Sequence, residues 1–169
     1  MVLRRAIVAD VEVLEHWDRQ PHVIAATGED DVIDWRSELA IAEPPQETLI
    51  AELDGRAIGV VQIIDPALEA THYWGDVDLG LRALDIWIGE ADDLGRGYGT
   101  QMMALALRRC FDPPEVSAVL IDPLVSNTDA HRFYRRLGFV SVGEQLFGSD
   151  RCLVHRLERE KWSEQGGAG

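Results

Sequence analysis

The sequence has little cysteine and no long apolar run. Only Cys110 and Cys152 are present, far apart and outside any Cys-x-x-Cys pattern, which argues against a disulfide framework or a zinc knuckle and favours two buried thiols in a reducing compartment. No stretch approaches the roughly 20 apolar residues of a membrane span, and residues 1–8 lack the apolar run of a signal peptide. We therefore expect a cytoplasmic protein without a membrane partner.

Basic residues are also few, 16 against 30 acidic ones, and the formal net charge is −14. Such a charge repels polyanions and attracts cations, so we expect no nucleic-acid partner. The five histidines show no metal-ligand spacing, and we expect no metal. The acids are concentrated between Asp65 and Asp93, where Arg82 is the one strong base. The eight acids there are Asp65, Glu69, Asp76, Asp78, Asp85, Glu90, Asp92 and Asp93.

Hydrophobic periodicity predicts one mixed α/β domain over residues 1–162, with a disordered tail at 163–169. A long irregular segment, 65–81, interrupts the pattern. Asp10 is expected to cap the first helix, Pro21 to end or interrupt it, and the Asp54-Gly55 pair to form a hairpin turn. Asn127 is expected to cap the helix 127–138, and the helix 99–111 is expected to bury an apolar stripe of Met103, Ala106, Leu107 and Cys110. Strands are expected at 3–8, 48–53, 57–64, 84–88, 116–121, 139–142 and 152–157, and helices after Asp10 and at 30–42, 99–111 and 127–138.

A glycine-rich turn, Leu94-Gly95-Arg96-Gly97-Tyr98-Gly99-Thr100, lies between the strand 84–88 and the helix 99–111. Glycines at alternate positions leave backbone amides accessible, and a helix N-terminus attracts anions. The spacing matches neither the dinucleotide fingerprint nor the Walker loop, which would need other residues around Thr100. The turn therefore indicates either a phosphate site or a plain tight turn.

Two further positions suggest chemistry. The helix 127–138 carries Phe133 and Tyr134 on one stripe, which indicates either a core aromatic pair or a phenol able to protonate a thiolate, since a tyrosine pKa of about 10 exceeds the thiol value of about 8.5. Asp85 interrupts an apolar strand in which aspartate is rare, with Asp85 and Trp87 expected on one face. It is either a functional base, an ion-pair partner of Arg82 or a cap for a backbone group.

The glycine turn followed by Asn127-x-x-Ala130-x-x-Phe133-Tyr134-x-x-Leu137-Gly138-Phe139 resembles the GNAT acyltransferase superfamily. The resemblance implies a mixed, mostly antiparallel sheet whose parallel fourth and fifth strands splay around acetyl-CoA, with helices on its faces. It also implies a pyrophosphate on the amides of Arg96 to Thr100 and Tyr134 as general acid. Leu94 departs from the Arg or Gln of many members. The implied cofactor-binding residues are Trp87, Ile88, Leu94, Gly95, Arg96, Gly97, Tyr98, Gly99, Thr100, Asn127, Ala130, Phe133 and Tyr134.

Within that superfamily, residues 74–140 resemble the aminoglycoside 6′-N-acetyltransferases. The similarity lies in Asp78-Leu79-Gly80-Leu81-Arg82-Ala83-Leu84-Asp85, in Asp112-Pro113-Pro114-Glu115-Val116 and in Asp122-Pro123-x-x-Ser126-Asn127. It implies that Asp85 is the base and that Asp122 contacts the substrate amine. Trp74 and Tyr73 either stack on a sugar ring or cation, or simply pack. The expected substrate-binding residues are Trp74, Asp76, Asp78, Asp85 and Asp122.

The resulting hypothesis is acetyl transfer from acetyl-CoA to a primary amine of a polycationic small molecule, an aminoglycoside 6′-amine. A backbone N–H of residues 85–88 would hold the oxyanion. Two alternatives stay open. The acceptor could be a siderophore hydroxylamine, a polyamine or a peptide amine, or the chain could be a noncatalytic CoA-binding module.

Overall fold

The chain divides into two compact units, each built from two segments of sequence. The computed structural model describes residues 1–28, 33–41, 46–69 and 71–166. Unit 1 comprises Met1–Ile63 and Asp85–Ala106, and unit 2 comprises Ile64–Leu84 and Leu107–Gly169. The chain passes from one unit to the other three times: at the last residue of strand β3 (Arg56–Ile64), within strand β4 (Leu81–Ile88) and within helix α4 (Tyr98–Phe111). The assignment of residues 1–162 to a single domain stays a prediction.

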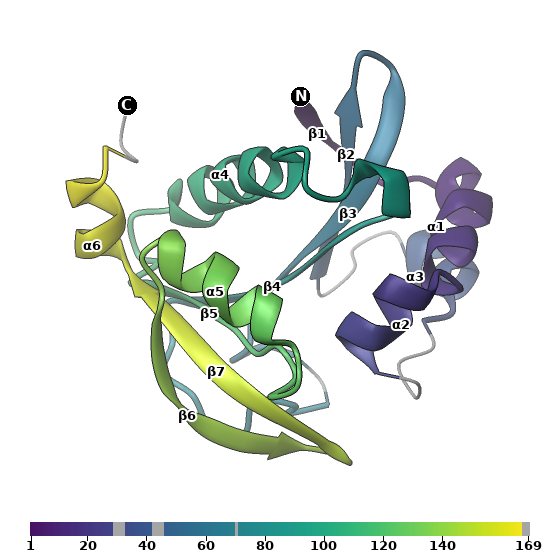
Figure 1. The fold of residues 1–169 in the computed structure, drawn as a ribbon. Coiled ribbons are helices and arrows are strands. Elements are labelled where there is room, and N and C mark those ends of the chain that lie inside the picture. The colour runs from purple at the N-terminus through teal and green to yellow at the C-terminus, as the bar shows by residue number, and fades with distance from the viewer. Residues whose placement is uncertain (29–32, 42–45, 70, 167–169) are drawn as a thin grey trace. The chain divides into compact units, whose positions relative to one another are not determined.

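Unit 1 holds the first three strands, the end of β4 and a group of short helices (Figure 1). The predicted hairpin is confirmed, because Asp54 and Gly55 both have positive φ (52° and 80°) and join two antiparallel strands. The hydrophobic core of unit 1 contains the buried side chains of Trp17 and Trp35 together with that of Trp87. The elements are β1 (Val2–Arg5), η1 (Val8–Asp10), α1 (Val11–Asp18), α2 (Pro21–Thr27), α3 (Trp35–Ala40), β2 (Gln46–Leu53), β3 (Arg56–Ile64) and η2 (Ala91–Asp93).

The N-terminal segment differs from the prediction in two places. The first strand stops at Arg5 rather than at residue 8, because the Asp10 carboxylate accepts a hydrogen bond from the Ile7 amide (2.9 Å) and pairs with Arg4 (2.8 Å), which turns the chain into η1. Asp10 therefore caps η1, and its side chain makes no capping bond to α1. The predicted interruption at Pro21 is confirmed, since α1 ends at Asp18 and Pro21 opens α2, where its missing N–H costs nothing.

The third helix is shorter than predicted. It begins at Trp35, where the Asp34 carboxylate accepts a hydrogen bond from the Ser37 amide (3.1 Å) and caps it. It ends at Ala40. The expected helical residues 30–32 and 42, together with the expected stop at Pro44-Pro45, lie outside the described residues.

Unit 2 holds the beginning of β4, the end of α4 and all later elements (Figure 1). Strand β4 pairs in parallel with β5, in a register that sets Leu81–Ala83 against Ala118–Leu120. Strand β7 pairs antiparallel with both β5 and β6. Residues 65–69 and 71–80 form turns and irregular chain, as predicted. The elements are β5 (Ala118–Ile121), α5 (Thr128–Arg136), β6 (Val140–Phe147), β7 (Asp150–Glu158) and α6 (Arg159–Glu164).

The strand order β1-β2-β3-β4-β5-β7-β6 describes a seven-stranded, mostly antiparallel sheet with a parallel β4–β5 pair, flanked by helices. This confirms the predicted fold class. Helix α6 extends through Ser163 and Glu164, two residues into the expected tail. Contacts within unit 2 explain it, since Trp162 stacks on Phe111 (4.8 Å between ring centroids) and Arg159 donates a hydrogen bond to the Val116 carbonyl (2.6 Å). Residues 167–169 lie outside the description.

Within the described residues, no helix combines the length and the apolar content that crossing a bilayer requires.

Candidate active site

The glycine turn of unit 1 leads directly into α4. Gly95 and Gly97 have φ of 72° and 79°, and a Cβ at either position would meet nothing within 4 Å. Backbone conformation, rather than space, therefore requires glycine at both. Residues 94–97 are exposed, and the first amides of an α-helix have no intrahelical acceptor. An exposed turn followed by such amides fits the diphosphate of a CoA-type cofactor.

An ion pair between a buried carboxylate and an exposed guanidinium holds the beginning of this turn. Asp93, the last residue of η2, is buried and accepts two hydrogen bonds from the Arg56 guanidinium, at 2.6 and 2.9 Å. These bonds lower the pKa of Asp93 below its ordinary value. Because Arg56 belongs to β3, the pair joins a core strand to the chain just before Leu94. Asp93 therefore serves the structure of unit 1.

Asp85 lies in β4 and is half-buried. The expected alternation is interrupted around it, because Ala83 and Leu84 are both buried while Asp85 and Ile86 are both half-buried. Trp87 is buried too, with its indole 6.3 Å from that of Trp35 in the unit 1 core. Any contact between Trp87 and a cofactor would therefore use its main chain.

The end of β4 is fixed by a residue that the sequence did not single out. His22 of α2 donates a hydrogen bond from Nε2 to the carbonyl oxygen of Ile88 (2.9 Å). The two residues are 66 positions apart, and no local pattern links them. This bond anchors the end of β4, from which η2 leads to the glycine turn.

Unit 2 carries the predicted asparagine and tyrosine on helix α5. Asn127 Oδ1 accepts a hydrogen bond from the Ala130 amide (3.1 Å), so the predicted cap is confirmed. Its amide nitrogen is then the group suited to bind a ligand. Tyr134 is buried against the rings of Phe133, Phe139 and His155, whose centroids lie 5.3, 5.8 and 6.0 Å from its own. Ala130 and Phe133 are half-buried on the same helix.

The aromatic residues of the irregular segment have different environments. Trp74 is 7% exposed and belongs to the core cluster of unit 2. Tyr73 is 46% exposed, stacks on Phe147 with a centroid distance of 4.3 Å, and donates its hydroxyl to Asp122 Oδ2 at 2.8 Å. Tyr73, rather than Trp74, is therefore the aromatic side chain suited to meet a ligand, and it fixes one oxygen of Asp122.

The acids between Asp65 and Asp93 separate into two groups. Several make structural bonds. Asp65 pairs with Arg82 (2.8 Å), Glu69 accepts from the Tyr73 amide (2.8 Å), and Glu90 accepts from the Trp17 indole (3.2 Å). By contrast, Asp76, Asp78 and Asp92 are exposed. Asp76 and Asp78 of unit 2 are thus suited to attract a cation.

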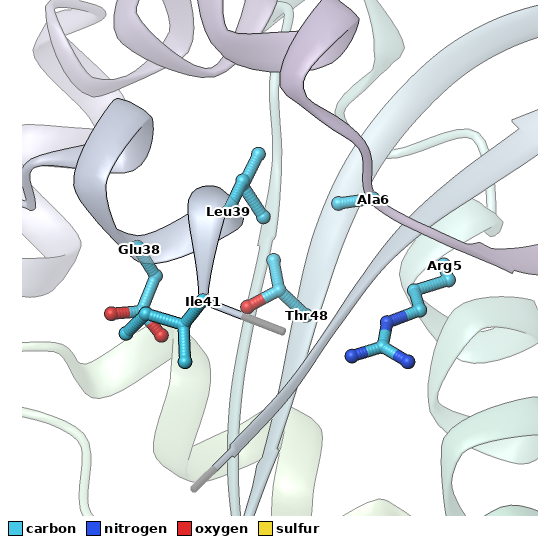
Figure 2. A pocket seen from close by; sticks show the side chains of 6 residues that line it. All are labelled: Arg5, Ala6, Glu38, Leu39, Ile41 and Thr48. Atoms are coloured by element: carbon cyan, nitrogen blue, oxygen red, sulfur yellow. The ribbon is translucent and has the colours of Figure 1, made fainter. Parts of the chain in front are cut away.

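Other features of the described residues do not add to this site. No group of three or more His, Cys, Asp or Glu side chains among them could hold a metal ion. A small pocket in unit 1 has a volume of about 20 Å³, room for about one water, and Figure 2 shows the side chains that line it. None of the predicted site residues lines it. Its lining consists of Arg5, Ala6, Glu38, Leu39, Ile41 and Thr48.

Comparisons with known proteins identify the family. A model of the acetyltransferase (GNAT) domain matches residues 6–147. An aminoglycoside N(6′)-acetyltransferase type 1 of Klebsiella pneumoniae is 28% identical over 151 residues, covering 85% of this chain and 75% of its own. The lysine N-acyltransferase MbtK of Mycobacterium tuberculosis is 26% identical over 163 residues, covering 92% and 76%.

A solved structure resembles the whole chain. The structure of the aminoglycoside acetyltransferase AAC(6′)-Ib in complex with coenzyme A superposes with a TM-score of 0.87 and 25% sequence identity. The match covers 98% of this chain and 98% of that one. The glycine turn, the capped helix α5 and the sheet with its parallel strand pair thus occur in a chain that the family model matches over most of its length. The chain belongs to the GNAT acetyltransferase family, and it is an acetyl-CoA-dependent N-acetyltransferase.

Proposed function

We propose that the acceptor is a primary amine of an aminoglycoside, the 6′-amine. The likeness to AAC(6′)-Ib over 98% of both chains carries this proposal. The charge distribution supports it, because a net charge of −14 and the exposed Asp76 and Asp78 favour a polycationic acceptor over an anionic one. Asp122, oriented by the Tyr73 hydroxyl, would accept a hydrogen bond from the substrate amine.

The proposed chemistry uses one carboxylate and one phenol. Bound acetyl-CoA supplies an acetyl thioester. The Asp85 carboxylate removes a proton from the substrate ammonium, which frees the nitrogen to form the C–N bond while the C–S bond breaks. A backbone N–H of residues 85–88 stabilises the carbonyl oxygen as it becomes negative. Tyr134 gives its phenolic proton to the departing sulfur, and the second amine proton replaces it. The products are the amide, free CoA and one proton.

The remaining proposed roles concern the cofactor. The amides of Arg96, Gly97, Tyr98, Gly99 and Thr100 would hold the pyrophosphate, since they combine an exposed turn with a helix N-terminus. Leu94 and Gly95 would line the same turn. In unit 2, the Asn127 amide nitrogen would bind CoA, and Ala130 and Phe133 would contact it. In unit 1, Trp87 and Ile88 would contribute main-chain groups.

An acceptor screen tests the proposal directly. Release of free CoA is followed with kanamycin, ribostamycin, spermidine and a lysine derivative at equal concentrations. We expect kcat/KM to be at least about tenfold higher for the aminoglycosides, a difference of about 1.4 kcal/mol in transition-state binding. Preference for the lysine derivative would instead favour the chemistry that MbtK's name describes. No release with any of these amines would contradict the proposed acceptor.

The role of Asp85 has a separate test. Asp85→Asn keeps the size of the side chain but removes its basicity, so we expect kcat/KM to fall about 10²- to 10⁴-fold, the range for loss of a general base. Asp92→Asn is the matched control, since Asp92 is an exposed acid of the same unit. Near-normal turnover in Asp85→Asn, with the control also normal, would remove Asp85 from this role.

The role of the exposed acids is tested with salt. If Asp76 and Asp78 attract a polycation, KM for the aminoglycoside should rise as ionic strength increases, because exposed charges are screened over about 8 Å at physiological salt. The double variant Asp76→Asn, Asp78→Asn should weaken that dependence. A KM that does not change between low and high salt contradicts electrostatic capture.

A further inference from the structure

Two histidines are buried beside Tyr134 in unit 2. His131 of α5 and His155 of β7 are 5% and 0% exposed. Their rings stack with centroids 5.2 Å apart, and His131 Nδ1 lies 3.0 Å from His155 Nε2. The other ring nitrogen of His131, Nε2, lies 3.2 Å from the carbonyl oxygen of Val125. The two imidazoles therefore form a hydrogen-bonded chain that ends on the backbone.

The carbonyl oxygen sets the direction of this chain. Because a carbonyl only accepts, His131 Nε2 carries the proton and donates it to Val125. In the neutral ring His131 Nδ1 is then an acceptor, so His155 donates from Nε2. This leaves His155 Nδ1 as a bare acceptor, and within the described residues it is buried without a hydrogen-bond partner. Burial keeps His155 neutral, lowering its pKa to about 4.

Such an arrangement is costly for packing alone. A buried acceptor without a partner costs about 1–3 kcal/mol, whereas two apolar side chains of the same shape would avoid that cost. The hydrogen bond between the two rings does link α5 to β7 in one orientation. Tyr134 lies beside this link, because it follows His131 by three residues on the same side of the helix and its ring lies 6.0 Å from that of His155.

We propose that His131 and His155 are positioning residues for Tyr134: their hydrogen bond fixes helix α5 against β7, and the His155 ring fixes the orientation of the phenol ring. The inference rests on the proposed role of Tyr134 as general acid. A phenol must be held closely to protonate a departing sulfur, because small misplacements of a reacting group cost large factors in rate. The expected contribution is to kcat rather than to acetyl-CoA binding.

A double-mutant cycle tests the inference. His155→Phe keeps an aromatic ring and removes the hydrogen bond. The paired variant His131→Leu, His155→Phe also removes both rings, so that neither ring nitrogen is left unpaired, and only the half-buried Val125 carbonyl loses its donor. We expect each to lower kcat about 10- to 100-fold and to leave KM for acetyl-CoA within about twofold. In a Tyr134→Phe background the same changes should lower kcat by less than about twofold, since interacting residues are not additive.

The other outcomes are distinguishable. An equal loss of kcat with Tyr134 present and in the Tyr134→Phe background would mean that the histidines act only through the stability of unit 2, and it would overturn the inference while leaving the proposed function intact. Unchanged kcat in the folded paired variant would also overturn it. Near-normal kcat in Tyr134→Phe would overturn the acid role and the inference together. Leu157→Ala, a loss of buried volume from the same strand, controls for destabilisation and should be additive with Tyr134→Phe.

Discussion

Gly89 follows β4 and precedes η2, and the space beside it is filled by a tryptophan. A Cβ at this position would lie 2.0 Å from Trp17 Cε2 and 2.1 Å from Trp17 Nε1. Ordinary contacts between carbon atoms are about 3.5–4.0 Å. Trp17 is 1% exposed, so its indole cannot move into solvent. Gly89→Ala should therefore displace a rigid ring inside the unit 1 core.

The magnitude follows from two losses. Overpacking a core typically costs about 1–3 kcal/mol, and moving the indole breaks its hydrogen bond to Glu90 (3.2 Å), worth about 0.5–1.5 kcal/mol. We expect a loss of about 2–4 kcal/mol in the free energy of unfolding. At about 2–4 °C per kcal/mol for a chain of this size, Tm should fall by about 5–15 °C.

Thermal unfolding followed by circular dichroism measures this effect. Gly148→Ala is the control, because Gly148 has a positive φ of 57° but nothing within 4 Å of an added Cβ, so only backbone strain of about 1 kcal/mol is expected. Trp17→Leu should make room, so that Gly89→Ala costs at least about 1 kcal/mol less in that background. A Tm for Gly89→Ala within about 2 °C of the unaltered protein would refute the steric argument.

Two further predictions concern stability. Asn127→Ala removes the α5 cap and should cost about 1 kcal/mol, measurable by urea denaturation, whereas Asn127→Asp keeps the accepting oxygen and should cost less; equal losses would contradict a capping role. Burial lowers the pKa of His155 from 6.5 to about 4, so as the pH falls the unfolded chain binds a proton at His155 before the folded protein does. The contribution of neutral His155 to the free energy of unfolding is therefore complete above about pH 6.5 and is lost as the pH falls towards 4. The difference in unfolding free energy between the unaltered protein and His155→Phe should therefore shift by about 1–3 kcal/mol between pH 7 and 4.5, and a constant difference would contradict it.

Local signals in the sequence predicted much of the fold. The Asp54-Gly55 turn, the Asn127 cap and the apolar stripe of α4 each act within a few residues, and the structure confirms all three. Pro21 shows the limit of such signals, since proline is equally suited to follow one helix or to begin the next. In the structure α1 ends at Asp18, and Arg19 and Gln20 connect it to Pro21, which begins α2.

The candidate site depended more on distant contacts. Arg56 and Asp93 are 37 positions apart, and His131 and His155 are 24 apart. Neither pair has a sequence pattern, because the partners meet only after the strands have paired. Acidic character alone could not separate Asp93, which serves the fold, from exposed acids such as Asp78.

The interleaved segments of the two units limit how the chain can be divided. Unit 1 needs residues 85–106 to complete what Met1–Ile63 begins, and unit 2 likewise needs Ile64–Leu84 and Leu107–Gly169 together. A protease cut within 71–80 would therefore not release an autonomous half, since each fragment would carry part of both. Reconstitution from two co-expressed pieces cut there is consequently a natural way to make acetyl transfer depend on the association of two fusion partners.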